Sequence, residues 1–350
     1  MATNSFNRRN QVQGMWTLAL AGMLCVPAYQ VSAQQVEKSS KAGTGVYEAV
    51  ISSQDNHIYV TAAGSRNNPN GALYKIDLAT LAVVDSIPLK ENPPFGIAIN
   101  NKTQIAYTSN TRTNSVSAVD LKSGKLIATF NHGGEKSHTR EVLVDEDSNT
   151  IYVTDVGKPS SIWVIDGKTN TFSHLIENTG ATTTGLTFVG NDRNKIYVTN
   201  MGDNGIAVID VKSRKVEKSF PSGGESPINI VSDGKRLFVT NQKSGTVTVL
   251  STDGELLKSI ATGAGAIGIA YDPVKNRIYS ANRQTGTTTV IDAETYAVLA
   301  DLPTGSHPNH VKIDPNTGTA YVINKAKGGR PVEGQPLVVD DNGDTVTKIN

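Results

Sequence analysis

Histidine is concentrated in two short segments of this 350-residue chain. HGGEKSHTRE (132–141) and GSHPNH (305–310) together hold four of the six histidines, His132, His138, His307 and His310. Imidazole beside carboxylate is a side-chain combination that binds metals and performs general acid–base catalysis. Neither segment has the close ligand spacing of a zinc motif, so we expect no metal and no cofactor.

Nucleophilic and nucleotide-dependent chemistry lack their usual motifs. The sequence contains no G-x-S-x-G elbow and no phosphate-binding glycine loop. Its single cysteine, Cys25, lies in the segment that we interpret below as a signal peptide, so the mature chain would have no thiol and no disulfide. General acid–base work by His138, Glu141 or His310 is the catalysis that these residue types leave open.

The first 33 residues have the three parts of a secretory signal peptide. Arg8 and Arg9 precede an apolar run from Met15 to Val26. The small-residue pattern of a cleavage site follows and ends at Ala33. Such a run is too short to cross a hydrocarbon core of about 30 Å, so we expect cleavage after Ala33 and no transmembrane segment in the mature chain. After removal of this segment with Arg8 and Arg9, the mature chain would contain 31 basic and 32 acidic residues. This balance gives no overall attraction to nucleic acid.

A repeated six-residue sequence motif, called the phrase below, indicates the architecture that would position the candidate side chains. KIYVTN (195–200) has six further versions: HIYVTA (57–62), IAYTSN (105–110), TIYVTD (150–155), RLFVTN (236–241), RIYSAN (277–282) and TAYVIN (319–324). Their aromatic residues are 48, 45, 45, 41, 41 and 42 residues apart. Periods of this length are typical of the four-stranded blades of a β-propeller. We expect the tyrosine and valine in the core and the asparagine at the start of a turn.

Each period contains four short runs with the composition of strands. The phrase is followed by an apolar run such as GIAVID (205–210), an outer run such as KVEKSF (215–220) and an inner run such as SPINIVSD (226–233). We therefore predict an all-β fold: a seven-bladed β-propeller of four-stranded antiparallel blades, formed by residues 34–350 as a single domain and a monomer. The last period lacks a fourth strand, and VEKS (36–39) repeats VEKS (216–219) of an outer run. We predict that the N-terminal strand completes the last blade.

Seven corners lead into the innermost strands, and their residues differ. At one aligned position three corners have glycine, at 96, 185 and 268, and the other four have Glu48, Glu141, Asn229 and His310. The residue before is Tyr47, Phe95, Arg140, Thr184, Ile228, Ile267 or Asn309. These corners open on the central channel. We predict a ligand site at the channel mouth of this top face, formed by Glu48, Phe95, His138, Arg140, Glu141, Asn229, His307 and His310. The alternative is a set of solvated channel residues with no ligand.

Two further features depart from the repeat. Residues 325–344 form a long top-face loop, which is either functional or disordered and which we interpret as a lid over the mouth. Trp163 stands where other blades have Ser117, Ala207, Thr248 and Thr289. We expect it to pack in the core.

The phrase Y-V-T-N followed by V-I-D resembles the YVTN-type β-propeller family. The export signal and the stretch TNTFSHLIENTGATTTGLTF (169–188) resemble its periplasmic YncE-like members. This resemblance implies a periplasmic, non-catalytic binding or scaffold protein, and it adds single-stranded DNA to small anions as a candidate ligand. The alternative is a lactonase-like hydrolase at the same mouth, with Arg140 holding an anionic substrate and Glu141 or His310 as the base.

Overall fold

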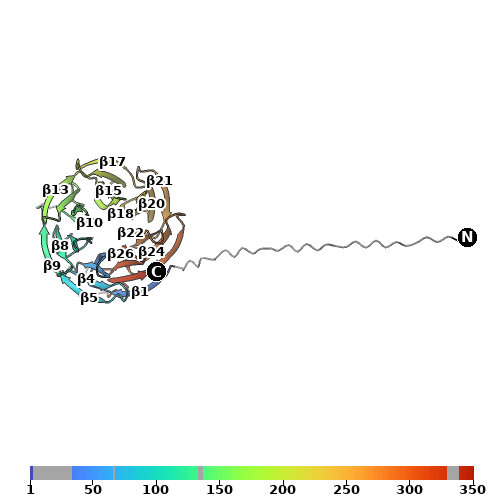
Figure 1. Cartoon of the computed structure of the whole chain (residues 1–350), viewed down its shortest axis with the longest axis horizontal. Helices are drawn as coiled ribbons and strands as arrows, with labels where there is room; N and C mark the ends of the chain where they lie inside the picture. Colours follow the sequence, from blue (N-terminus) through green and yellow to red (C-terminus); the bar gives the residue numbers. More distant parts are fainter. Residues whose placement is uncertain (3–33, 66–67, 133–136, 329–338) are drawn as a thin grey trace, which may run out of the picture. The chain divides into compact units, whose positions relative to one another are not determined.

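The computed structural model describes residues 1–2, 34–65, 68–132, 137–328 and 339–350. The chain divides into two units, Met1–Ala33 and Gln34–Asn350. The second unit forms the ring of strands in Figure 1. The predicted signal peptide and the middle of the predicted lid lie outside the described residues, apart from Met1 and Ala2.

The ring consists of seven four-stranded antiparallel sheets, as the sequence predicts. Blade one contains β2 (Val46–Ile51), β3 (His57–Ala62), β4 (Ala72–Asp77) and β5 (Val83–Pro88). Blade two contains β6 (Ile97–Asn100), β7 (Ile105–Asn110), β8 (Ser115–Asp120) and β9 (Lys125–Phe130). Blade three contains β10 (Thr139–Asp145), β11 (Thr150–Asp155), β12 (Ser161–Asp166) and β13 (Thr171–Glu177).

The other four blades repeat this order from the channel to the rim. Blade four contains β14 (Thr183–Val189), β15 (Asp192–Asn200), β16 (Gly205–Asp210) and β17 (Lys215–Pro221). Blade five contains β18 (Pro227–Ser232), β19 (Arg236–Asn241), β20 (Thr246–Ser251) and β21 (Leu256–Ala261). Blade six contains β22 (Ala266–Asp272), β23 (Arg277–Asn282), β24 (Thr287–Asp292) and β25 (Val298–Pro303). Blade seven contains β26 (His307–Ile313), β27 (Ala320–Lys325), β28 (Thr345–Ile349) and β1 (Val36–Lys41).

The N-terminal strand closes the ring. β1 pairs antiparallel with β28, from Val36 opposite Ile349 to Lys41 opposite Thr345. Lys41 Nζ also donates to the backbone oxygens of Asp340 and Gly343, each at 2.7 Å. Closure through the last blade is therefore confirmed.

The core lies between the blades. Seven clusters of buried apolar side chains each join two neighbouring blades, so every blade packs on both of its faces. For this reason the second strands read as continuous buried runs, whereas an outer strand such as β17 alternates between exposed and half-buried residues. No helix in the described part of the chain is long and apolar enough to cross a membrane.

The repeated threonine joins adjacent blades. Thr240 Oγ1 accepts a hydrogen bond from Asn229 N at 3.2 Å and donates one to Ile267 O of the next blade at 3.0 Å. Thr199 makes the same pair of contacts in blade four. Blade seven has no hydroxyl at this position, and Asn309 Nδ2 there donates to Tyr47 O of blade one at 2.8 Å.

The repeated asparagine begins a turn and also bonds within its own blade. Asn282 Nδ2 donates to the hydroxyls of Thr287 and Thr289 on the third strand, at 3.2 and 2.8 Å. In blade three the third strand has Trp163, which is fully buried, as expected. Its indole N–H is a donor, and the asparagine is replaced by Asp155, whose Oδ2 accepts that bond at 3.0 Å.

Candidate anion site at the channel mouth

The innermost strands begin at the top face, and their close approach explains the three corner glycines. A Cβ on Gly185 would lie 2.7 Å from Ile228 O, and one on Gly268 would lie 2.6 Å from Asn309 O of the following blade. The side chains of the polar corner residues lie in the space beside these glycines. Glu48 Oε2 accepts from Ile97 N, the residue after Gly96, at 3.2 Å.

Two of the predicted site residues form a carboxyl pair at the hub. Glu48 and Glu141 come from blades one and three, are 3% and 8% exposed, and share a side-chain hydrogen bond. Burial raises the pKa of Glu48 well above its usual range, and the charge of Glu141 acts in the same direction. Asn229 Nδ2 of blade five donates to Glu141 Oε1 at 3.4 Å. Residues from blades one, three and five thus meet across the channel.

Two arginines, Arg140 and Arg283, carry positive charge at the mouth. Arg140 Nε lies 3.8 Å from Glu141 Oε1, which is an ion pair without a hydrogen bond. Arg283 Nη2 of blade six donates to Asn309 Oδ1 at 2.6 Å, and its guanidinium interacts electrostatically with Tyr47. Burial lowers the pKa of Arg283, and the positive charge of Arg140 lowers it further. The buried Nε of each arginine has no hydrogen-bond partner in the described part of the chain.

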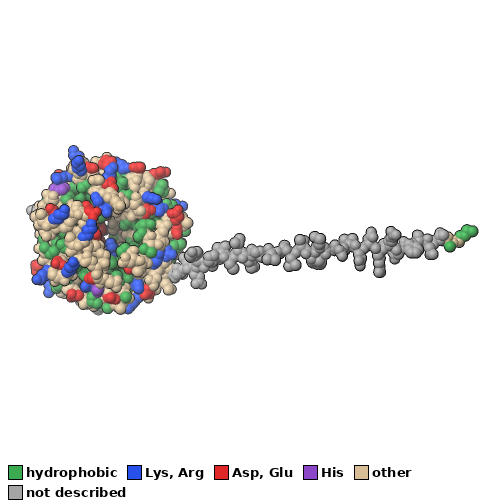
Figure 2. All heavy atoms as spheres, in the orientation of Figure 1, with side chains coloured by type: hydrophobic (Ala, Val, Ile, Leu, Met, Phe, Trp, Pro, Cys, Tyr) green, Lys and Arg blue, Asp and Glu red, His purple; other side chains and the backbone are tan. Residues whose placement is uncertain are grey.

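Aromatic side chains form one wall of the mouth. The rings of Tyr47 and Phe95 meet edge to face, with centroids 5.1 Å apart. Lys325 Nζ lies 5.1 Å from the Tyr47 centroid, and the Arg112 guanidinium lies 5.3 Å from that of Phe95. Figure 2 shows a hollow at the centre of the ring with basic and acidic side chains beside it.

The predicted histidines do not gather into one group. His138 is exposed, with Arg140 and Asp155 as its charged neighbours, whereas His307 has Arg283 and Lys327 on the other side of the mouth. His310 Nδ1 accepts from Ala49 N at 3.3 Å. Burial lowers the pKa of His310 to about 3, and nearby Lys312 adds to the effect, so this ring is neutral at physiological pH.

The structure therefore brings Glu48, Arg140, Glu141 and Asn229 together, with Phe95 at the edge of the mouth. It adds four residues that the prediction did not include: Tyr47, Arg283, Asn309 and Lys312. Tyr47 and Asn309 occupy the aligned position before the chosen one, and Lys312 follows His310 by two residues, a spacing that keeps a strand side chain on the same face. No group of three or more histidine, cysteine or acidic side chains suited to a metal occurs among the described residues.

This molecule is a closed seven-bladed propeller with a polar hub and a cationic mouth. Residues 94–271, about half of the chain, match the family described as YNCE-like beta-propeller, and the chain belongs to that family. The uncharacterized protein YncE of Escherichia coli K12 is 31% identical over 208 residues, and that of Salmonella typhi is 33% identical over 208 residues. Each match covers 57% of this chain and 58% of the relative, which is less than two thirds of its length.

The fold also occurs in a distant solved structure. A chain of Kuenenia stuttgartiensis hydrazine synthase superposes with a TM-score of 0.68, covering 81% of this chain and 94% of that chain. Its sequence identity is 18%. At this distance the likeness concerns the fold alone.

Proposed function

We propose that this protein is a non-catalytic binding propeller that holds an anionic ligand at the top-face channel mouth. The observation that supports this most directly is the electrostatic interaction of Arg140 with Arg283. They come from blades three and six, the charge of Arg140 lowers the pKa of the buried Arg283, and each has a buried Nε without a hydrogen-bond partner in the described residues.

Two like charges at a half-buried position are unfavourable unless an anion lies between them. Despite its burial, the pKa of Arg140 is raised by nearby Tyr47, Glu141 and Glu48. Arg283 lacks such compensation, because it forms no ion pair with a described carboxylate and burial lowers its pKa. Guanidinium groups bind phosphate and carboxylate through planar pairs of N–H donors. A bound phosphate or carboxylate would satisfy the two free donors and separate the charges.

Single-stranded DNA is the extended ligand that we propose for this mouth. Strands without sequence preference bind where basic groups follow the phosphates and aromatic rings stack on the bases. Tyr47 and Phe95 place two rings beside Arg283 and Arg112. The proposal concerns a local site, since the chain as a whole has little net charge.

Fluorescence anisotropy with a labelled single-stranded oligothymidylate tests this function, with tripolyphosphate as the competing small anion. We expect salt to weaken binding by roughly 0.7 log units per log unit of salt for each phosphate contacted. Arg140→Ala and Arg283→Ala should each reduce affinity about tenfold, or about 1.4 kcal/mol. Lys168→Ala, which removes an exposed charge from a β12–β13 turn on the opposite face, is the matched control.

Three outcomes separate the ligands. If tripolyphosphate competes with the oligonucleotide and both arginine variants lose affinity, the result supports a binding site at the mouth. Binding of tripolyphosphate without the oligonucleotide restricts the function to small anions. Equal affinity in wild type, Arg140→Ala and Arg283→Ala would place any anion elsewhere and contradict the proposal.

The hub carboxyls favour one second candidate, a lactonase-like hydrolase. Two neighbouring carboxyls, of which Glu48 has a raised pKa, are the arrangement in which one acts as acid and the other as base. Hydrolysis of a panel of lactones, followed against pH, tests it. Turnover that is abolished by Glu141→Gln and reduced by Glu48→Gln would favour the enzyme, and no turnover above that of the double variant would exclude it.

We also propose that residues 1–33 direct export to the periplasm. The support is the signal-like pattern of the sequence and the start of β1 at Val36, directly after the expected cleavage site. Expression of the full chain in a Gram-negative host, fractionation and mass measurement test this. We expect periplasmic protein that begins at Gln34, and cytoplasmic protein of full length would contradict it.

A further inference from the structure

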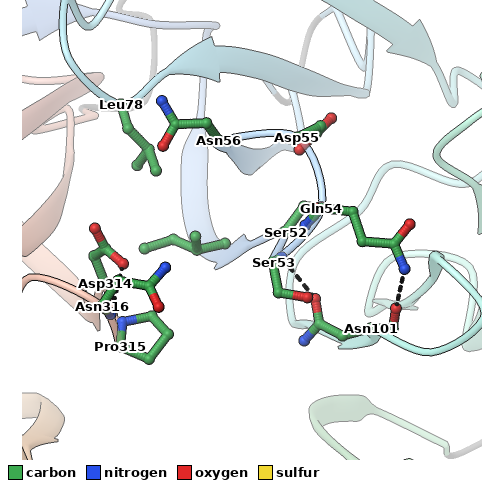
Figure 3. A pocket seen from close by; sticks show the side chains of 11 residues that line it. Ser52, Ser53, Gln54, Asp55, Asn56, Leu78, Asn101, Asp314, Pro315 and Asn316 are labelled. Carbon is green, nitrogen blue, oxygen red and sulfur yellow. Dashed lines mark hydrogen bonds between the residues drawn. The ribbon is translucent and has the colours of Figure 1, made fainter.

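The bottom face, where the innermost strands end, has a pocket of its own. It has a volume of about 270 Å³ and is formed by the loops after β2, β6 and β26 together with Leu78. Figure 3 shows Leu78 and Pro315 on one side and Gln54 and Asn101 on the other. We propose that this pocket binds a neutral saccharide unit, independently of any ligand at the top-face mouth.

One wall of the pocket is held by hydrogen bonds within the protein. Asn101 Oδ1 accepts from Ser53 N at 2.9 Å, and Asn101 O accepts from Gln54 Nε2 at 2.9 Å. Asn101 Nδ2 donates to Glu146 Oε1 of the next blade at 3.1 Å. This wall is therefore fixed before a ligand arrives, which reduces the entropy cost of binding.

Other amides in the lining have no partner. Within the described residues, the side chains of Asn56 and Asn316 form no hydrogen bond, and Gln54 uses only its Nε2. Each amide offers a carbonyl acceptor and two N–H donors. A hydroxyl both donates and accepts, so neighbouring amides from different loops suit adjacent hydroxyl groups.

The opposite side of the pocket combines apolar side chains with Asp314 and Asn316. Ile51 and Leu78 are buried, and Pro315 also lines the pocket. Pockets of this kind combine apolar surface with a few placed polar groups. A pyranose has the same division, with C–H groups on its faces and hydroxyls around its edge.

Charge in the pocket argues against an anion. Asp314 is 8% exposed, accepts from Asn316 N at 3.0 Å and from Thr317 Oγ1 at 2.8 Å, and forms no ion pair with any described cation. Asp55 is paired with Lys75 Nζ at 2.9 Å. One uncompensated carboxylate disfavours phosphate and accepts hydroxyl donors. This pocket and the mouth therefore select opposite chemistry.

An adjoining pocket extends the surface. It has a volume of about 340 Å³ and shares Gln54 and Asp55 with the first, and Tyr59 and Lys122 also line it. A chain of two sugar units would follow the shared wall. Asp55 Oδ1, at this junction, is buried without a hydrogen-bond partner in the described residues.

Isothermal titration of the mature protein tests the proposal with D-glucose, N-acetyl-D-glucosamine and maltose as probes, and with choline and inorganic phosphate as charged controls. We expect saturable binding of at least one sugar and tighter binding of the disaccharide. The double variant Asn56→Gly, Asn316→Ala should weaken it about tenfold, or about 1.4 kcal/mol. Glycine suits position 56, because Asn56 has a φ of 53°.

Two variants locate the site. Ser53→Trp should abolish sugar binding by filling the pocket, since Ser53 is exposed and only its backbone is bonded to Asn101. Asn114→Gly is the matched control for Asn56→Gly. Asn114 has a φ of 51°, no described side-chain hydrogen bond, and a position on the top face. Absence of sugar binding, equal binding in Ser53→Trp, or binding of choline or phosphate that Ser53→Trp removes would each overturn the proposal. Arg140→Ala should leave the sugar titration unchanged, so this result does not depend on the mouth.

Discussion

The seven copies of the repeated phrase and the seven corners belong to the same blades, yet their polar groups differ. In the phrase, hydroxyls such as those of Thr199 and Thr240 have both a donor and an acceptor. In the corners, Arg140 and Arg283 each have a nitrogen without a partner among the described residues, and the pKa of Glu48 is raised by burial and by Glu141. Positions that repeat join the blades of the ring, and positions that depart from the repeat place ionisable side chains at its centre.

Removal of the N-terminal strand should cause the largest loss of stability, and it tests whether the repeated phrase alone holds the ring together. Deleting residues 34–42 exposes the edge of β28 and removes the Lys41 contacts to the loop before it. We expect the free energy of unfolding to fall by several kcal/mol, although every copy of the phrase is retained. Thermal unfolding followed by circular dichroism measures this. A melting temperature equal to that of the intact mature chain would show that the phrase alone holds the ring.

Thr240→Val tests the phrase itself. The substitution keeps the shape of the side chain and leaves Asn229 N and Ile267 O without their buried partner. We expect a loss of about 1–3 kcal/mol in unfolding free energy and no change at either proposed ligand site. Denaturant unfolding checks the loss, with Thr129→Val on an exposed outer strand as the control. Equal stability of the two variants would mean that the inter-blade hydroxyl is dispensable.

The architecture was predictable because each blade repeats the same physical problem. A strand buried on both faces has apolar side chains on both faces, so the phrase at Tyr59, Tyr107 and Tyr279 identified buried residues. Closure was predictable from VEKS, because β1 fills the place that β17 fills in blade four. The role of Asp155 was not, since its partner Trp163 is known only once the two strands are paired.

The candidate site was predictable only in part. Alignment of the corners selected Glu48, Glu141 and Asn229, which do meet at the hub. It could not show that the charge of Arg140 acts on Arg283, because this interaction crosses the ring between blades three and six. The pocket at Asn101 and Asn316 was missed because its residues are ordinary turn formers, and only the placement of three loops around one space distinguishes them.

The hub carboxyl pair provides the smallest and most specific test of the comparison. Glu48 faces Glu141 and Arg140 at the hub, and it interacts with Lys312 of blade seven. Its folded-state pKa is raised, so the folded protein holds this proton more tightly than the unfolded chain, whose glutamate pKa is about 4.3. Its contribution to stability therefore falls as pH rises from that value through the folded-state pKa, and it is constant above.

Glu48→Gln removes this titration and keeps a group that can donate a hydrogen bond to Glu141. Between pH 5 and pH 8 the melting temperature of the wild type should fall by a few degrees more than that of the variant. All other ionisable side chains are the same in the two proteins, so the difference between them reports on position 48. Glu217→Gln, at an exposed ion pair with Lys195 on the rim, is the control and should follow the wild type. Identical pH dependence of wild type and Glu48→Gln would mean that the hub holds no excess proton. The charges of the hub would then be balanced by their neighbours, as the polar groups of the repeated phrase are satisfied by their hydrogen bonds.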